Sequence, residues 1–202
     1  MSPQPIANVP VAFPTDLRLR HAFFRVAPRG YGLARRLWQK RLRSLGVVAM
    51  PATFGFTILL DIADYHGCSI AMHGTHEPPI TALLCRELRP GDVFVGVGAN
   101  HGWFSLLAAH RLRPDAGRVF AFEPQAKLSS LLRRSAEINH LDNLVVVQAA
   151  PGDRASRGAV CLPSPDESRY GSLFPAGAAV DAVDVRTAGR SVLRPHANAS
   201  QD

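Results

Sequence analysis

The residues whose types and spacing point most directly to chemistry are the turn from Gly96 to Gly102 and the acid at Glu123. Glycines let a ligand approach the backbone, and a helix that starts just after such a turn offers unpaired N–H groups to an anion. Glu123 ends the next apolar run, where a carboxylate can accept hydrogen bonds from both hydroxyls of a ribose. Together these residues predict a site for an adenosine-containing cofactor.

The spacing of the glycines separates two classes of cofactor. A dinucleotide fingerprint reads G-x-G-x-x-G, but counting from Gly96 puts His101 at the third glycine position. S-adenosylmethionine needs less, namely a turn for its methionine part and an acid for its ribose. The pattern therefore favours S-adenosylmethionine. One alternative is a nucleotide-dependent oxidoreductase, and the other is a non-catalytic remnant that binds a surface or nucleic acid through a basic helix.

The elements that must position this turn alternate along the chain. The apolar run 93–97 is typical of a strand buried on both faces of a parallel sheet. Strand and helix patterns then alternate, which predicts βαβ units in a doubly wound α/β sheet whose ligands bind at the carboxyl ends of the strands. The further predicted elements are strands at 53–63, 118–123, 143–150, 158–162 and 182–186, and helices at 79–88, 102–112 and 125–139.

Several of these segments resemble one family. "GDVFVGVGANHGWFSLLAA", "GRVFAFEPQ" and "INHLDNLVVVQAAPGD" are similar to the core of the FkbM-type methyltransferases, and "LLDIADYHGCSIAMHGTHEP" and "YGSLF" extend the similarity over residues 53–187. The resemblance implies a class I methyltransferase (Rossmann-like) sheet that uses S-adenosylmethionine to methylate a hydroxyl of a sugar or secondary metabolite. The cofactor residues that it implies, or that share its turn, are Gly96, Gly98, Asn100, Gly102 and Glu123.

His101, within the turn, is the candidate catalytic base for the hydroxyl proton, and a surface histidine at a helix start is the alternative. The chain departs from the family pattern at Gly96, where the family normally has aspartate.

A second departure follows residue 187, where "AGRSVLRPHANASQD" replaces a strand of the I-D-V-E-G type. We therefore expect a partial methyltransferase domain at 53–187, an irregular tail at 188–202 and a sheet that is incomplete at the C-terminus. The strand at 93–97 would then be an edge with its apolar faces uncovered, and turnover would be poor.

The N-terminal part has a different composition. Residues 1–16 are rich in proline and predicted to be disordered, whereas 17–52 form a basic segment predicted to be helical. Within it, residues 31–45 place leucines on one half of a helical wheel and Arg and Lys on the other. A helix packed on the domain is favoured, an anionic membrane surface is the next possibility, and nucleic acid is an unlikely partner.

A patch of possible metal ligands lies between residues 65 and 78. Its spacing fits no zinc motif, so a hairpin with exposed histidines is favoured over a metal site. The residues of this patch are His66, Cys68, His73, His76 and Glu77.

Cellular location is predicted from cysteines and hydropathy. The odd number of cysteines, without a C-x-x-C pair, predicts free thiols in a reducing compartment. With no secretory signal and no run of about 20 apolar residues, the prediction is a cytoplasmic protein.

Overall fold

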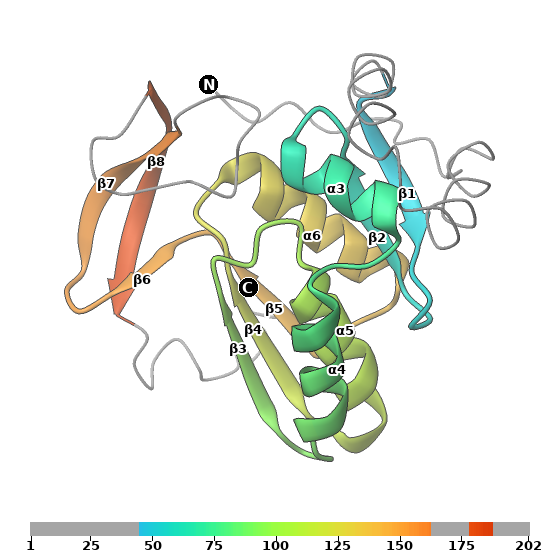
Figure 1. Ribbon diagram of the computed structural model, residues 1–202. Helices are drawn as coiled ribbons and strands as arrows, with labels where there is room; N and C mark the ends of the chain where they lie inside the picture. The colour runs from blue at the N-terminus through green and yellow to red at the C-terminus, as the bar shows by residue number, and fades with distance from the viewer. Residues whose placement is uncertain (1–44, 163–177, 188–202) are drawn as a thin grey trace, which may run out of the picture.

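The computed structural model describes residues 45–162 and 178–187, and its centre is a three-stranded parallel sheet (Figure 1). The strands β3 (Val93–Val97), β4 (Arg118–Phe122) and β5 (Leu144–Val147) lie in the order β3-β4-β5. Helix α5 (Trp103–Leu112) connects the first two strands and α6 (Ala126–Ile138) the last two. The predicted α/β arrangement of successive βαβ units is confirmed, and each of these elements lies within a few residues of its predicted range.

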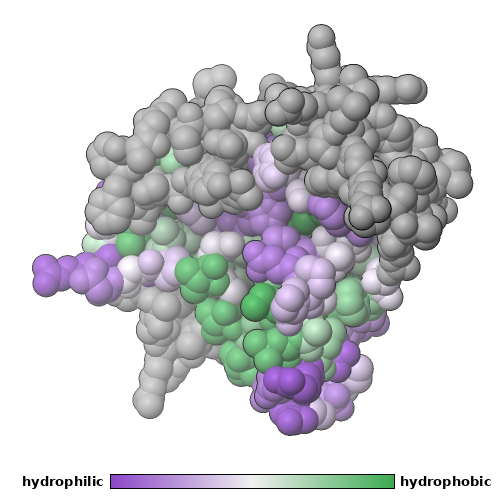
Figure 2. Space-filling view, in the orientation of Figure 1, coloured by the Kyte–Doolittle hydropathy of each residue, from purple (hydrophilic) through white to green (hydrophobic). Residues whose placement is uncertain are grey.

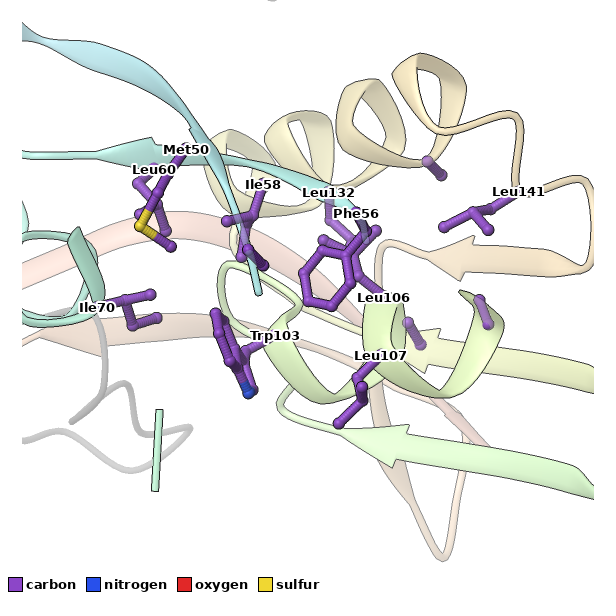
Figure 3. Packing of buried hydrophobic residues seen from close by; sticks show 14 of the residues in the cluster. Met50, Phe56, Ile58, Leu60, Ile70, Trp103, Leu106, Leu107, Leu132 and Leu141 are labelled. Carbon is purple, nitrogen blue, oxygen red and sulfur yellow. The ribbon is translucent and has the colours of Figure 1, made fainter. Parts of the chain in front are cut away.

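The two crossover helices cover the same face of this sheet. Val119 and Ala121 of β4 share one buried cluster with Leu106 of α5 and Leu132 of α6. Figure 3 labels these two leucines among the residues of the cluster. On the opposite face, the alternate side chains of β3 are exposed, at 58% for Val93, 40% for Val95 and 66% for Val97. In the part of the chain that the structure describes, nothing pairs with the outer edge of β3. Among the described residues β3 is therefore an edge strand, as predicted, with one of its two faces exposed. The expectation that this apolar run is buried on both faces is wrong, because no described strand continues the sheet beyond β3.

A β-hairpin packs beyond these helices. Strands β1 (Val47–Pro51) and β2 (Thr57–Asp61) pair antiparallel, and β2 contacts α6. The predicted helical segment 17–52 is thus wrong over residues 47–51, where β-branched Val47 and Val48 form a strand that β2 completes. The strand predicted at 53–63 begins only at Thr57, because a turn with Gly55 at φ +91° precedes it.

Two helices precede the central sheet. Residues Tyr65–His73 form α3, so the hairpin predicted for the histidine patch is wrong. Asp64 caps this helix by accepting a hydrogen bond from the Gly67 N–H at 3.0 Å, and Gly74, at φ +68°, ends it. Helix α4 (Pro78–Glu87) confirms the short helix predicted at 79–88.

A second small sheet follows β5. It comprises β6 (Ala150–Gly152), β7 (Ser156–Leu162) and β8 (Ala178–Thr187), in the order β6-β8-β7. The predicted strand pair at 158–162 and 182–186 is confirmed as the antiparallel pair β7–β8. Residues 1–44, 163–177 and 188–202 lie outside the described residues, as do the predictions made for the N-terminal 16 residues, the basic helix and the C-terminal tail.

The cysteines and the lengths of the helices were also predicted from the sequence. Cys68, Cys85 and Cys161 form no disulfide, as the sequence predicted. Across 45–162 and 178–187, every helix is too short or too polar to cross a bilayer.

Candidate cofactor site

Gly98 leaves open space at the carboxyl end of β3. Its φ is +65°, which an L-residue rarely adopts, and an ideal Cβ built on it would meet no atom within 4 Å. The next residue is anchored to the neighbouring strand, because the Ala99 N–H donates to the Phe122 carbonyl at 2.9 Å. The turn therefore holds an unobstructed glycine beside the end of β4.

Glu123 stands at that end of β4 and is held by backbone donors. Its Oε2 accepts a hydrogen bond from the Asn100 N–H at 2.6 Å, and its Oε1 accepts one from the Gln125 N–H at 2.9 Å. The residue is only 2% exposed. Each oxygen of the carboxylate thus accepts a backbone hydrogen bond, and these bonds fix the orientation of Glu123.

Asn100 links Glu123 to the start of α5. Its backbone has φ +53°, a conformation that asparagine tolerates better than most residues. Its side-chain Oδ1 accepts from the His101 N–H at 2.8 Å and lies 2.6 Å from His101 Nδ1. This contact requires the proton of a neutral His101 to be on Nδ1, since an amide oxygen can only accept. Asn100 thus holds both the acid and the histidine.

His101 is buried rather than presented to solvent, with 1% of its surface exposed. Its Nδ1 lies 3.9 Å from Asp64 Oδ2, and its Nε2, which is buried without a hydrogen-bond partner, faces Gly67 of α3. Burial lowers the pKa of His101 to about 4, against the opposing effect of the Asp64 and Asp61 carboxylates. The imidazole is therefore neutral at pH 7, and its ring lies between the turn and α3.

The other two glycines of the turn region have different roles. An ideal Cβ on Gly102, whose φ is +88°, would lie 2.1 Å from Leu132 Cδ1, so this glycine allows α5 and α6 to approach. An ideal Cβ on Gly96, within β3, would lie 2.9 Å from Ser105 Oγ. Of the three, only Gly98 faces open space.

Some residues that support the site were not identified from the sequence. Trp103, the first residue of α5, donates its Nε1–H to Thr81 Oγ1 of α4 at 3.0 Å and is 2% exposed. Helix α5 itself begins without a side-chain cap hydrogen bond. Asp64 and Leu132 were not identified either. The signals that could have found them are an N-cap aspartate before α3 and the apolar stripe of α6.

The histidine patch forms a ring cluster beside the site. The ring centroids of His66 and His76 are 4.5 Å apart, those of His66 and His101 are 5.9 Å apart, and those of His76 and Phe104 are 5.2 Å apart. Of the three histidines in this patch, only His73 is exposed, so the prediction of exposed histidines is wrong for His66 and His76. Within the described ranges, no three His, Cys, Asp or Glu side chains are placed to hold a metal ion.

The turn lies outside three hollows in the described surface. Three hollows of about 390, 450 and 320 Å³ are walled by described residues, and none has Gly98 or Glu123 in its wall. The space at Gly98 is therefore not part of these hollows.

Comparisons with known proteins give structural similarities only. No protein-family model matches the chain, and no curated protein matches it. Among solved structures, TYW2 of M. jannaschii in complex with AdoMet is 17% identical, with 50% of this chain and 42% of that chain covered and a TM-score of 0.41. Precorrin-6y C5,15-methyltransferase from Geobacter metallireducens is 27% identical, with 35% and 36% covered and a TM-score of 0.31.

A third similar structure is coclaurine N-methyltransferase bound to N-methylheliamine and SAH. It is 16% identical, with 67% of this chain and 42% of that chain covered and a TM-score of 0.36. The chain thus spans less than half the length of each of the three structures. Because these TM-scores are low, the assignment of the α/β fold rests on the strand order and crossover helices of this chain and not on the similar structures.

Proposed function

We propose that this chain carries the adenosine-binding half of an S-adenosylmethionine site and belongs to a methyltransferase of the FkbM type. The observation that carries the proposal is the open backbone at Gly98 beside Glu123, whose carboxylate is oriented by two backbone N–H groups. The acceptor proposed from the family resemblance is a hydroxyl of a sugar or secondary metabolite. Three cysteines without a disulfide accord with a reducing, cytoplasmic setting.

Each residue of the proposed site would have a separate role in binding the cofactor. Glu123 would accept hydrogen bonds from the ribose hydroxyls, and Gly98 would let the cofactor lie against the backbone. When bound, the cofactor supplies a methyl group on a sulfonium, and the chain's task is to align the acceptor oxygen with it. Asn100 contributes by keeping the Glu123 carboxylate in place through its N–H.

We assign His101 a positioning role within this proposal. Its Nδ1–H can hold Asn100 Oδ1 at 2.6 Å, which fixes the residue that orients Glu123. To act as the base that the sequence suggested, the ring would have to leave its place between the turn and α3, where Nδ1 contacts Asn100 and Nε2 faces Gly67. This assignment places His101 behind the cofactor residues rather than at the reacting atoms.

The test is calorimetric binding of S-adenosylhomocysteine to the wild-type chain and to two glycine variants. Gly98→Ala projects a methyl group into the space that the cofactor would occupy, and should weaken binding at least about tenfold. Gly46→Ala is the matched control, since Gly46 has φ +66° and likewise has no atom within 4 Å of its ideal Cβ. Both variants carry similar backbone strain. A larger loss of affinity in Gly98→Ala than in Gly46→Ala would therefore indicate that the cofactor lies against Gly98.

Each result decides the proposal. No heat of binding from folded wild-type protein at millimolar ligand would contradict it, and tighter binding of NAD would favour the oxidoreductase. An equal loss of affinity in Gly98→Ala and Gly46→Ala would show that strain, not occupancy, controls binding. The acceptor class is tested separately, by methyl transfer from labelled S-adenosylmethionine to a panel of sugar and polyketide hydroxyls.

A further inference from the structure

We infer that the free edge of β3 is a homodimer interface, at which the β3 strands of two copies pair antiparallel about Val95. The inference concerns a surface, and it goes beyond the proposed cofactor site. It arises from three features: a strand edge with no charged residue, proline or described neighbouring strand, a self-complementary strand sequence, and an apolar surface that continues onto α4.

The β3 edge lacks the features that usually prevent pairing. Natural edge strands carry charges or proline, or are covered by another element. Residues 93–97 contain neither a charge nor a proline, and no strand among residues 45–162 and 178–187 pairs with the outer side of β3. Val97 and Val93 are the two most exposed of the large hydrophobic residues described, at 66% and 58%.

The opposite edge of the same sheet differs. At β5, the guanidinium of Arg133 donates to the Val146 carbonyl at 3.4 Å. The hollow at this edge is lined by charged side chains as well, among them Glu137 and Asp142. Charged groups therefore occupy the β5 edge, whereas the β3 edge presents only backbone and apolar side chains.

The sequence V-F-V-G-V is complementary to itself in one antiparallel register. Centring the pair on Val95 uses all five residues, placing Val93 opposite Val97 of the second copy and Val95 opposite its own equivalent. On the helix-covered face, Phe94 then lies opposite Gly96, which has no side chain to obstruct the ring. Within one chain the Phe94 ring already lies 3.4 Å from the ideal Cβ position of Gly96. Such a two-fold contact uses the same patch on both copies.

The apolar surface extends beyond the strand. Ile80 and Leu83, three residues apart on α4, are 42% and 43% exposed. Figure 2 shows the hydrophobic surface running along β3 toward α4 in the lower half of the view. A five-residue strand pair is small compared with the roughly 1,200–2,000 Å² that stable interfaces bury, so the α4 surface supplies additional area.

Cysteine cross-linking tests both the partner and the register. Directly opposed residues in an antiparallel pair have Cα atoms about 4.5–5.5 Å apart, within the range that a disulfide spans. In a Cys85→Ser background, which removes the only incompletely buried native thiol described, Val95→Cys should cross-link to itself under mild oxidation. Val93→Cys should cross-link with Val97→Cys when the two proteins are mixed. Val145→Cys is the control, because it is a 43% exposed valine in the same row two strands away.

A charge substitution gives an independent measurement. Val95→Lys would place two ammonium groups opposite each other at the two-fold axis and should weaken dimerisation at least about tenfold, as measured by sedimentation or light scattering. Val145→Lys should leave dimerisation unchanged, and circular dichroism establishes that both variants are folded.

The possible outcomes separate second-copy pairing from its alternatives. Dimers that Val95→Lys weakens, together with the 93–97 cross-link, support the proposal. A wild-type chain that stays monomeric at about 100 µM overturns it, as does a Val95→Lys dimer of unchanged strength. Purification with a different polypeptide that Val95→Lys releases would also overturn it, because the edge would then serve another partner.

Discussion

Replacing the buried His101 with glutamine should reduce the decrease in the free energy of unfolding between pH 7 and pH 5. The folded-state pKa of His101 is about 4, against an ordinary value of 6.5, so between these values the unfolded chain binds more protons. Stability due to this group is thus fully present above the unfolded pKa and decreases as the pH falls toward 4. At pH 5, 1.5 units below the ordinary value, the loss is about 2 kcal/mol relative to pH 7.

The assay is urea unfolding at pH 7 and pH 5 for the wild type, His101→Gln and His73→Gln. His73 is exposed, so its variant removes a histidine without removing a buried one. His76, whose pKa is lowered mainly by burial, is present in all three proteins and its effect cancels. The wild type and His73→Gln should lose about 2 kcal/mol more than His101→Gln. An equal loss in all three would refute the burial of a neutral imidazole at position 101.

Two further predictions concern the glycines of the turn region. Gly102→Ala should lower the free energy of unfolding by about 3 kcal/mol, because the new methyl group adds φ strain and overlaps the buried Leu132. Gly91→Ala is the control in thermal or urea unfolding. It adds φ strain alone and should cost about 1 kcal/mol. Gly96→Asp alone should lower stability by about 1–3 kcal/mol, since its Cβ meets Ser105 Oγ at 2.9 Å. Any gain in S-adenosylhomocysteine affinity from the restored acid should appear only with Ser105→Ala. A more stable Gly102→Ala, or an affinity gain in the single Gly96→Asp variant, would contradict these expectations.

The sequence was sufficient to predict the central sheet because its strands and helices differ sharply in pattern. The continuous apolar run at Val93–Val97 coincides with β3, and the leucine stripe after Gln125 became α6. The exposed edge of β3 was expected on a different ground, the absence of the I-D-V-E-G type strand that the resembled family has after residue 187. These elements are long or strongly periodic, so local pattern and tertiary packing indicate the same structure.

Helix α3 and strand β1 could not be predicted in the same way. Gly67 argued against a helix at α3, yet an ideal Cβ there would lie 2.1 Å from the Asp61 carbonyl oxygen, so packing requires a glycine within this helix. The helix signals were Asp64 at the start and Gly74 at the end, and the dense histidines obscured them. Similarly, Val47 and Val48 became a strand only because β2 pairs with them.

For the site, the sequence identified the residues but not their separate roles. Gly98 faces open space, Gly102 packs on Leu132, and Gly96 adjoins Ser105, although all three were predicted to approach a cofactor. The difference depends on side chains from α5 and α6 and on backbone φ, which no local pattern reveals. The burial of His101 against α3 was hidden for the same reason, since α3 itself was not predicted.

The contact between β2 and α6 has a consequence for the order of folding. Asn139, at the end of α6, accepts from the Thr57 N–H at 2.7 Å and donates to its carbonyl at 2.6 Å, while Ser135 accepts from the Leu59 N–H at 3.0 Å. Side chains of a helix therefore take the place of a neighbouring strand for β2, across sequence separations of 82 and 76 residues. During synthesis, β1 and β2 can pair as soon as both strands are present. The outer backbone groups of β2 form these hydrogen bonds only after residues 135–139 have been synthesised. Contacts of such range slow folding, so docking of α6 onto the hairpin should be a late event in the assembly of the core.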